Sequence, residues 1–215
     1  MRTFGSAFLR HQIKKRVAAT MQLLTDWALL ILVVIAGGLG TSWYMVEAGS
    51  SLSTVSSGPW VMWKTAARVD ADPYTRAHFA RLGAMPLSSE IGETYLARTD
   101  DEGRTLHSSC DYDVVLRSPG LAWWSLAVFD ADGQLIQNAA ERHAYTSDTA
   151  ALSPDGRFLA SLSRSASPGN WLPTGGAGRL TIVYTLIDMS LATGTGEEDV
   201  NLAERLPAIT QRSCR

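Results

Sequence analysis

The pattern of hydrophobic and polar positions divides the chain into two unlike parts. Residues 27–46 carry no charged side chain, and residues 29–35 among them form a continuous aliphatic run. Twenty helical residues rise about 30 Å, which is the thickness of the hydrocarbon core of a bilayer. Trp27 stands at one end of this run, and Trp43 and Tyr44 stand near the other, where interfacial aromatic residues belong. The run therefore predicts a single transmembrane helix.

The alternative for residues 27–46 is the apolar core of a cleaved signal peptide. Val46, Glu47 and Ala48 resemble the small-x-small pattern of a cleavage site. However, the stretch before the run is long, and the run exceeds the usual apolar core of a signal peptide. We therefore favour an uncleaved anchor.

Residues 1–26, before the run, have a pattern of their own. Leu9, Ile13, Val17 and Met21 recur every four residues, with basic side chains between them. This spacing predicts a short basic amphipathic helix that suits an anionic cytoplasmic leaflet. The alternative is a solvated, partly frayed tail.

After the run, residues 47–58 are small and polar, which is typical of a linker that can end in an edge strand. A helix is expected at residues 73–82, because Asp72 can cap it, Pro73 suits its first turn and Gly83 ends it. Hydrophobic residues then alternate with period two. Strands are expected at residues 94–97, 112–116, 122–129, 134–137, 157–163 and 180–187.

These strands are joined by turns such as Asp130–Gly133 and Ser153–Gly156. Short strands with such turns, and one clear helix among them, indicate a mainly β domain over residues 59–215. We expect an antiparallel β-sandwich or jelly-roll-like fold with one or two short helices, preceded by the transmembrane helix.

The charge distribution predicts the orientation in the membrane. Residues 1–26 hold five basic residues and one acidic residue, whereas residues 47–215 hold fourteen basic and twenty acidic residues. Basic residues stay on the cytoplasmic side, so the N-terminus is expected in the cytoplasm and residues 47–215 in the periplasm. The acidic balance of the outer part argues against nucleic acid as a partner. The interpretation is a single-pass inner-membrane protein whose first partner is the lipid bilayer.

The chain has two cysteines, Cys110 and Cys214, and both follow the apolar run. In an oxidising compartment they allow one intramolecular pairing, so we expect a disulfide between them. A metal site is disfavoured, because two thiols without nearby histidines fall short of the four ligands that zinc takes.

Several short motifs, taken in their order and spacing, resemble the bacterial family catalogued as domain of unknown function 1214 (DUF1214), in its membrane-anchored, single-domain form. They are Gly58-Pro59-Trp60, Ala71-Asp72-Pro73-Tyr74-Thr75-Arg76-Ala77, Cys110-Asp111-Tyr112, Trp123-Trp124-Ser125, Gly169-Asn170-Trp171-Leu172-Pro173 and Leu206-Pro207-Ala208-Ile209, followed by Cys214. The resemblance implies a mainly antiparallel β domain and no known reaction, so it carries over no catalytic residue. The chain departs from the family at Val183 and Thr185, where relatives tend to have an arginine before the tyrosine.

Residues that usually carry chemistry are scattered. His78, His107 and His143 are far apart and have no ligand spacing, so we expect surface or capping roles. Asp130–Gly133 opens like a calcium loop but lacks the later ligands, which favours a hairpin turn. Gly175–Gly178 precedes a strand instead of a helix, so we expect a loop tip and not a phosphate cradle. No cofactor or metal is expected, and no catalytic residue can be assigned.

Tryptophans are the remaining candidates for a site, as ligand-binding or packing aromatics: Trp60, Trp123, Trp124 and Trp171. Trp123 and Trp124 are neighbours in an expected strand, so they face opposite ways and only one can enter the core. We expect the helix at residues 73–82 to cover the other, and a ligand is the alternative.

The function that these patterns favour is a non-enzymatic binding or interaction module of the cell envelope, with an envelope protein or glycan as its ligand. The alternative is a hydrolase or other enzyme acting on envelope glycans. Such an enzyme would need two carboxylates facing each other across a cleft, about 5–10 Å apart.

Overall fold

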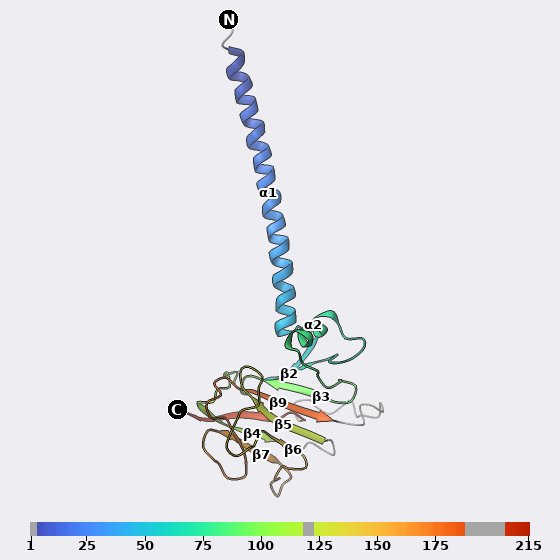
Figure 1. Ribbon diagram of the computed structural model, residues 1–215, viewed down its shortest axis with the longest axis vertical. Helices are drawn as coiled ribbons and strands as arrows, with labels where there is room; N and C mark the ends of the chain where they lie inside the picture. The colour runs from blue at the N-terminus through green and yellow to red at the C-terminus, as the bar shows by residue number, and fades with distance from the viewer. Residues whose placement is uncertain (1–3, 118–122, 188–204) are drawn as a thin grey trace. The chain divides into compact units, whose positions relative to one another are not determined.

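The computed structural model describes residues 4–117, 123–187 and 205–215, with the side chains of residues 4–15, 17 and 19 outside the description. The chain divides into two units, Met1–Ala48 and Gly49–Arg215. The first unit is one helix, α1 (Phe4–Ala48; Figure 1). Its segment Thr20–Ala48 is long and apolar enough to cross a membrane, by length and composition. The expected amphipathic stripe of Leu9, Ile13 and Val17 lies outside the described side chains.

In its described residues, the second unit contains two β-sheets and the short helix α2 (Pro73–Leu82). The strands are β1 (Thr54–Ser57), β2 (Trp60–Trp63), β3 (Glu93–Ala97), β4 (Cys110–Leu116), β5 (Trp123–Phe129), β6 (Ala144–Thr146), β7 (Phe158–Ser163), β8 (Asn170–Pro173), β9 (Thr181–Ile187) and β10 (Ala208–Cys214). One sheet has the order β1-β2-β3-β9-β5-β6, and the other has the order β10-β4-β7-β8. Figure 1 shows β9 and β5 side by side, as their antiparallel pairing requires.

Alternation along the strands builds the core between the two sheets. In β4 the buried positions alternate with partly exposed ones, and β9 does the same. The ring of Trp124 in the first sheet lies 4.8 Å from that of Phe158 in the second, so the sheets pack face to face. The expected fold class, a mainly β sandwich with few helices, is confirmed. One pairing differs from the antiparallel expectation, because β7 and β8 run parallel.

The start of the second unit is more ordered than a flexible linker. The carbonyl of Ser50 accepts hydrogen bonds from the backbone N–H groups of Ser53 and Thr54, at 2.9 and 2.7 Å. Gly49 has a positive φ of 74°, and a Cβ on it would collide with the Thr54 side chain. Residues 49–54 thus form a tight turn that leads directly into β1, the edge strand that the sequence allowed for.

Helix α2 begins and ends where its caps place it. Asp72 Oδ1 accepts from the backbone N–H groups of Tyr74 and Thr75, both at 3.0 Å, and Gly83 closes the helix in the left-handed conformation. The predicted helix is therefore confirmed. His78, expected at the surface, is instead 9% exposed and stacks on Trp63 with ring centroids 4.2 Å apart. A helical face that must cover β2 buries whichever side chain points there, and an imidazole ring stacks well on indole.

The expected strand at residues 134–137 is absent. Past the turn that follows β5, one isolated bridge joins Phe129 to Leu135. The reason lies in the sheet, because β5 already pairs with β9 on one side and with β6 on the other. β9 pairs with residues 123–129 of β5 and β6 pairs with residues 125–127 on the other edge, so the returning chain finds room only at the end of β5, where it makes the single bridge at Phe129.

Candidate functional site

The turn after β5 forms one wall of a cavity. Asp130 Oδ1 accepts from the backbone N–H groups of Asp132 and Gln134, at 2.9 and 2.8 Å. The Asp130 N–H donates to the carbonyl of Gln134 at 3.0 Å, and Gly133 takes a positive φ of 73°. The carboxylate is therefore used to build the turn, as the hairpin interpretation expects.

The glycine-rich loop between β8 and β9 forms the facing wall. Its end is fixed to another loop, because Ser108 N–H donates to the carbonyl of Gly178 at 2.7 Å and Gly178 N–H donates to Ser108 Oγ at 3.0 Å. Gly176 and Gly178 both have positive φ angles, which non-glycine residues rarely adopt. The loop is thus held at its base.

Between these walls lies a cavity of about 710 Å³, which we call the loop pocket. Its lining residues come from two segments about 40 residues apart in the chain: Phe129, Asp130, Gly133, Gln134, Leu135, Ile136, Gln137, Gly175, Gly176 and Ala177. The volume is within the range of small-molecule sites. The lining combines two side-chain amides and peptide groups of glycines with apolar surface, a composition suited to binding a neutral polar molecule.

The four candidate tryptophans lie in different places. Trp60 is 1% exposed, and its Nε1 donates to the Pro207 carbonyl at 2.7 Å. Trp171 is partly buried, and its Nε1 donates to the Ser163 carbonyl at 3.1 Å. Neither residue lines the loop pocket. Their indole N–H groups are satisfied by backbone carbonyls, which is the ordinary arrangement of packing tryptophans.

Trp123 and Trp124 face opposite ways, as strand geometry predicts. Trp124 is buried, whereas Trp123 is 38% exposed and its Nε1 donates to Asp148 Oδ2 at 3.0 Å. The expectation that α2 covers the second ring is wrong, because the helix stacks on Trp63 instead. In the sheet, β3 and β9 separate β2 from β5, so an element seated on β2 is about 14 Å from Trp123.

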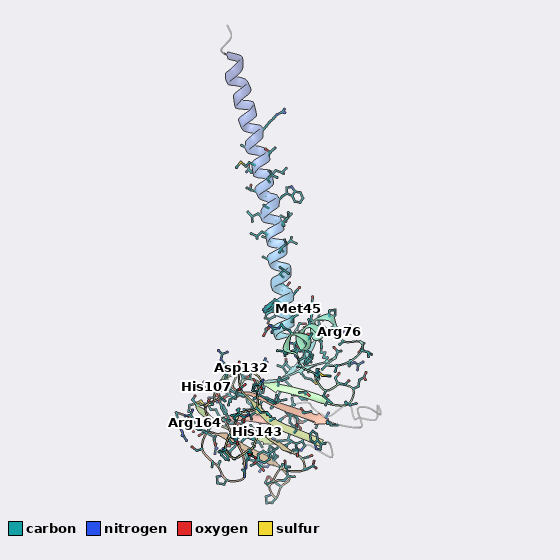
Figure 2. All side chains as sticks on the ribbon, in the orientation of Figure 1. Met45, Arg76, His107, Asp132, His143 and Arg164 are labelled. Atoms are coloured by element: carbon teal, nitrogen blue, oxygen red, sulfur yellow. A yellow bond between two sulfur atoms is a disulfide. The ribbon has the colours of Figure 1, made fainter. Side chains whose placement is uncertain are left out.

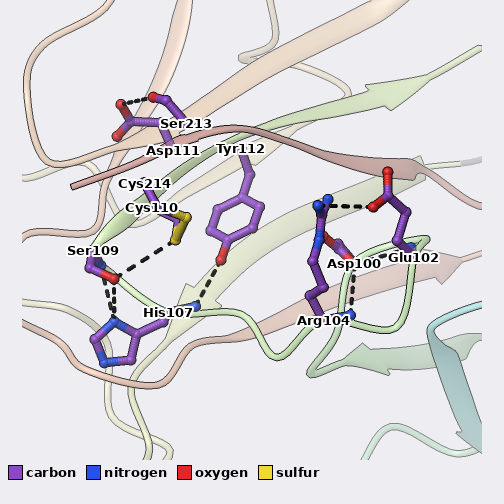
Figure 3. The surroundings of a disulfide bond; sticks show 10 residues. All are labelled: Asp100, Glu102, Arg104, His107, Ser109, Cys110, Asp111, Tyr112, Ser213 and Cys214. Carbon is purple, nitrogen blue, oxygen red and sulfur yellow. Dashed lines mark hydrogen bonds and ion pairs between the residues drawn. A yellow bond between two sulfur atoms is a disulfide. The ribbon is translucent and has the colours of Figure 1, made fainter.

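The two cysteines come together at the ends of neighbouring strands. Cys110 in β4 and Cys214 in β10 are paired in register, with Cα atoms 4.0 Å apart, and they form the disulfide that the sequence predicted (Figure 3). Nearby, Tyr112 Oη accepts from the backbone N–H of His107 at 3.0 Å. Burial raises the pKa of the Tyr112 phenol, so this oxygen remains protonated at neutral pH. The Tyr112 hydroxyl beside the disulfide thus serves to hold the backbone at His107 in place.

A carboxylate close to the disulfide is also structural. Asp100 accepts from the backbone N–H groups of Glu102 and Arg104 and from the Arg104 guanidinium, at 3.0, 2.9 and 2.7 Å (Figure 3). Burial works to raise the pKa of Asp100, but these donors outweigh it and hold the pKa below its usual range. The carboxylate is ionised and fully occupied in shaping its turn.

The histidines remain apart, and Figure 2 labels His107 and His143. Nδ1 of His107 accepts from the backbone N–H of Ser109 at 3.1 Å, which is the capping role expected. His143 Nδ1 lies 3.1 Å from the carbonyl of Ile136. Within residues 4–117, 123–187 and 205–215, no group of three or more His, Cys, Asp or Glu side chains could hold a metal ion.

The residues that line the loop pocket were not recognised as one site from the sequence. Asp130–Gly133 and Gly175–Gly178 were each identified as a turn or loop tip, but nothing in the pattern brings them together. Gln134 and Gln137 carried no signal at all, since polar residues after a turn are ordinary. The available signal was weak: two glycine-containing loops, each following directly on a strand.

Comparison with known proteins supports the fold more than the function. Residues 92–189 match the family model described as "Protein of unknown function (DUF1214)". The chain is similar to the crystal structure of the VPA0106 protein from Vibrio parahaemolyticus, with 20% sequence identity and a TM-score of 0.52. The match covers 70% of this chain and 39% of that one. A putative uncharacterized protein from Burkholderia cenocepacia is 18% identical, with a TM-score of 0.38 over 58% of this chain and 30% of that one. The chain thus spans well under half of either protein. No curated protein matches it.

Proposed function

Residues 92–189 belong to the DUF1214 family, whose function is unknown, and from that premise we propose that this chain is a membrane-anchored binding module of the cell envelope. In this proposal the apolar segment Thr20–Ala48 is the anchor, Gly49–Arg215 is periplasmic, and the loop pocket takes the ligand. The ligand is a neutral polar part of an envelope glycan or protein, and the module binds it without catalysing a reaction.

The chemistry of the loop pocket carries this proposal. Gln134 and Gln137 bring amide groups that both donate and accept hydrogen bonds, next to the apolar Phe129 and Leu135. Such a lining orients a neutral ligand and gains free energy by burying its apolar parts. Among the described lining residues the one carboxylate is Asp130, whose Oδ1 already accepts two backbone N–H groups. Hydrolysis of a glycan instead calls for two carboxylates free to act on it.

Two further features support the periplasmic location. Disulfides such as Cys110–Cys214 persist in oxidising compartments and are rare in the cytosol. The net charge of +4 before the apolar run, against −6 after it, favours an N-terminus inside and the remaining chain outside.

Muropeptides are a suitable probe of the loop pocket, because they carry both an envelope glycan and a peptide. We expect saturation-transfer NMR to detect their binding to the full chain in lipid nanodiscs. Gln137→Trp should abolish the signal, because residue 137 is exposed and an indole there fills the cavity. Ala139→Trp is the matched control, since this position is exposed and outside the lining. Absence of binding to the wild type, or equal binding by both variants, would contradict the proposal.

Topology can be tested independently of the ligand. A reporter enzyme that is active only in the periplasm, fused after Arg215, should be active in cells. Exchanging Lys14, Lys15 and Arg16 for glutamate should lower that activity, because it reverses the charge bias that sets orientation. The reporter activity per molecule, normalised to the amount of fusion protein, is the measurement. If a reporter active only in the cytoplasm works at the same position, the assignment is refuted.

The alternative, an enzyme acting on envelope glycans, has one observation in its favour. Trp123 is 38% exposed and its Nε1 donates to the carboxylate of Asp148, so an open aromatic ring and one carboxylate of the kind that glycan hydrolysis uses occur together on the surface. Mass spectrometry of the incubated muropeptides decides between the two functions. Intact muropeptides favour the binding module, whereas cleavage that is lost in Asp148→Asn favours the enzyme.

A further inference from the structure

The first 44 residues of the second unit expose aliphatic side chains far more than its remainder does. Leu52, Val69, Leu82 and Met85 are 80%, 92%, 56% and 99% exposed. From residue 93 onward, the most exposed large hydrophobic residue in the described chain is Leu152, at 52%. We call Leu52, Val69, Leu82 and Met85 the apolar rim. Side chains this bare are unusual on a soluble surface when several belong to one region.

Hydrogen bonds and ring contacts tie the parts that carry the apolar rim into one region. Lys64 Nζ donates at 2.6 Å to the carbonyl of Ser51, the residue before Leu52. Arg76 of α2, labelled in Figure 2, donates at 2.7 Å to the carbonyl of Val69. Leu82 is the last residue of α2, and Met85 follows its C-cap by two residues. Since α2 stacks on β2 through Trp63, all four rim positions belong to the substructure of β1, β2 and α2.

Charge complementarity indicates what covers the rim. Residues 49–92 hold four basic and three acidic residues, whereas residues 93–215 hold ten basic and sixteen acidic residues. Lys64 and Arg76, which donate to the carbonyls of Ser51 and Val69, place two basic side chains beside the rim. Aliphatic side chains interspersed with basic ones are typical of surfaces that enter the headgroup region of an anionic bilayer.

Chain length supports the same occupant. Leu52 follows Ala48, the last residue of α1, by four residues, which reach at most about 14 Å when fully extended. The tight turn at residues 49–54 consumes part of that reach. If α1 spans the membrane, as the proposed function holds, Leu52 cannot leave the neighbourhood of the bilayer surface.

We propose that the apolar rim inserts into the outer face of the bilayer, so that the β domain is held against the membrane by a second lipid contact besides α1. This inference rests on the membrane anchoring in the proposed function. Lys64 and Arg76 contact anionic headgroups while the four aliphatic side chains enter the boundary between headgroups and acyl chains. The loop pocket would then act at a restricted height above the membrane.

Lipid-attached quenchers test this contact on the full chain. Single variants Met85→Cys, Leu159→Cys and Leu32→Cys are labelled with a fluorophore, because the native cysteines are bonded to each other. Each is reconstituted in vesicles of phosphatidylethanolamine and phosphatidylglycerol that carry a spin label high on the acyl chain. Leu159, on β7, is the matched control at 49% exposure, and Leu32 reports the anchor. We expect at least about threefold more quenching at position 85 than at position 159.

The outcomes separate the two levels of the proposal. Quenching at position 32 with equal, weak quenching at 85 and 159 would overturn the rim contact and leave the anchor in place. No quenching at position 32 would overturn the anchor itself. Replacing phosphatidylglycerol with phosphatidylcholine should reduce quenching at 85 but not at 32, because only the rim contact depends on anionic lipid.

Discussion

Trp124→Ala should lower the free energy of unfolding by about 3–5 kcal/mol, the usual cost of deleting a fully buried large aromatic side chain. The ring is 1% exposed and lies 4.8 Å from Phe158 of the other sheet and 6.5 Å from Tyr184 of its own sheet. Its loss leaves a cavity where the two sheets meet, and the neighbouring side chains can collapse into that cavity only in part because they are held by their own packing. Denaturant unfolding of the full chain in nanodiscs, followed by circular dichroism of the β signal, measures the effect.

Trp123→Ala is the matched control, because it changes the same residue type one position away in the same strand. The exposed ring and its single hydrogen bond to Asp148 predict a loss of about 1 kcal/mol. Equal losses for the two variants would mean that the outer ring is also packed. A small loss for Trp124→Ala would contradict the sandwich core.

Local patterns were sufficient to predict much of the fold. The alternation in residues 112–116 identified β4 because one face of the strand enters the core and the other does not. Helix α2 was predicted with its caps, since Asp72 and Gly83 act within one turn of the helix. These features depend on residues that are close in the sequence, so the local sequence is enough to predict them.

Features that depend on distant partners could not be predicted in the same way. The expected strand at residues 134–137 does not form because β9 takes one edge of β5 and β6 takes residues 125–127 of the other. Helix α2 was expected to cover Trp123 but stacks on Trp63. Alternation along a strand shows which residues share a face, but it does not show which strands are neighbours in the sheet. The loop pocket could not be predicted for the same reason, since its two walls are about 40 residues apart in the chain and are brought together only by the order of the strands.

Breaking the disulfide should cost about 4 kcal/mol of stability. The bond joins residues separated by 104 positions, and closing a loop of this length removes entropy worth about 4–5 kcal/mol from the unfolded chain in the chain-entropy model. Cys110→Ser and Cys214→Ser should each lower the melting temperature of the full chain, and the double variant should cost little more than either, because all three remove one bond. Ser213→Ala is the control; its exposed hydroxyl makes one bond to Asp111, so the loss should stay within about 0.5 kcal/mol.

Amide hydrogen exchange should show that the disulfide protects one end of β10 more than the other. Ile209 is fully buried, and its backbone N–H donates to Asp101 Oδ2 at 2.9 Å while its carbonyl accepts from Asp101 N–H at 3.0 Å. These bonds remain when the cysteines are replaced, so the start of the strand should keep its protection. Ser213 and Arg215, beside Cys214, lose the covalent tie and should exchange faster in the double variant than in the wild type. Equally fast exchange at Ile209 and Ser213 in that variant would contradict this expectation. It would mean that the disulfide holds the whole of β10 to β4 and that burial of the Ile209 side chain is not sufficient.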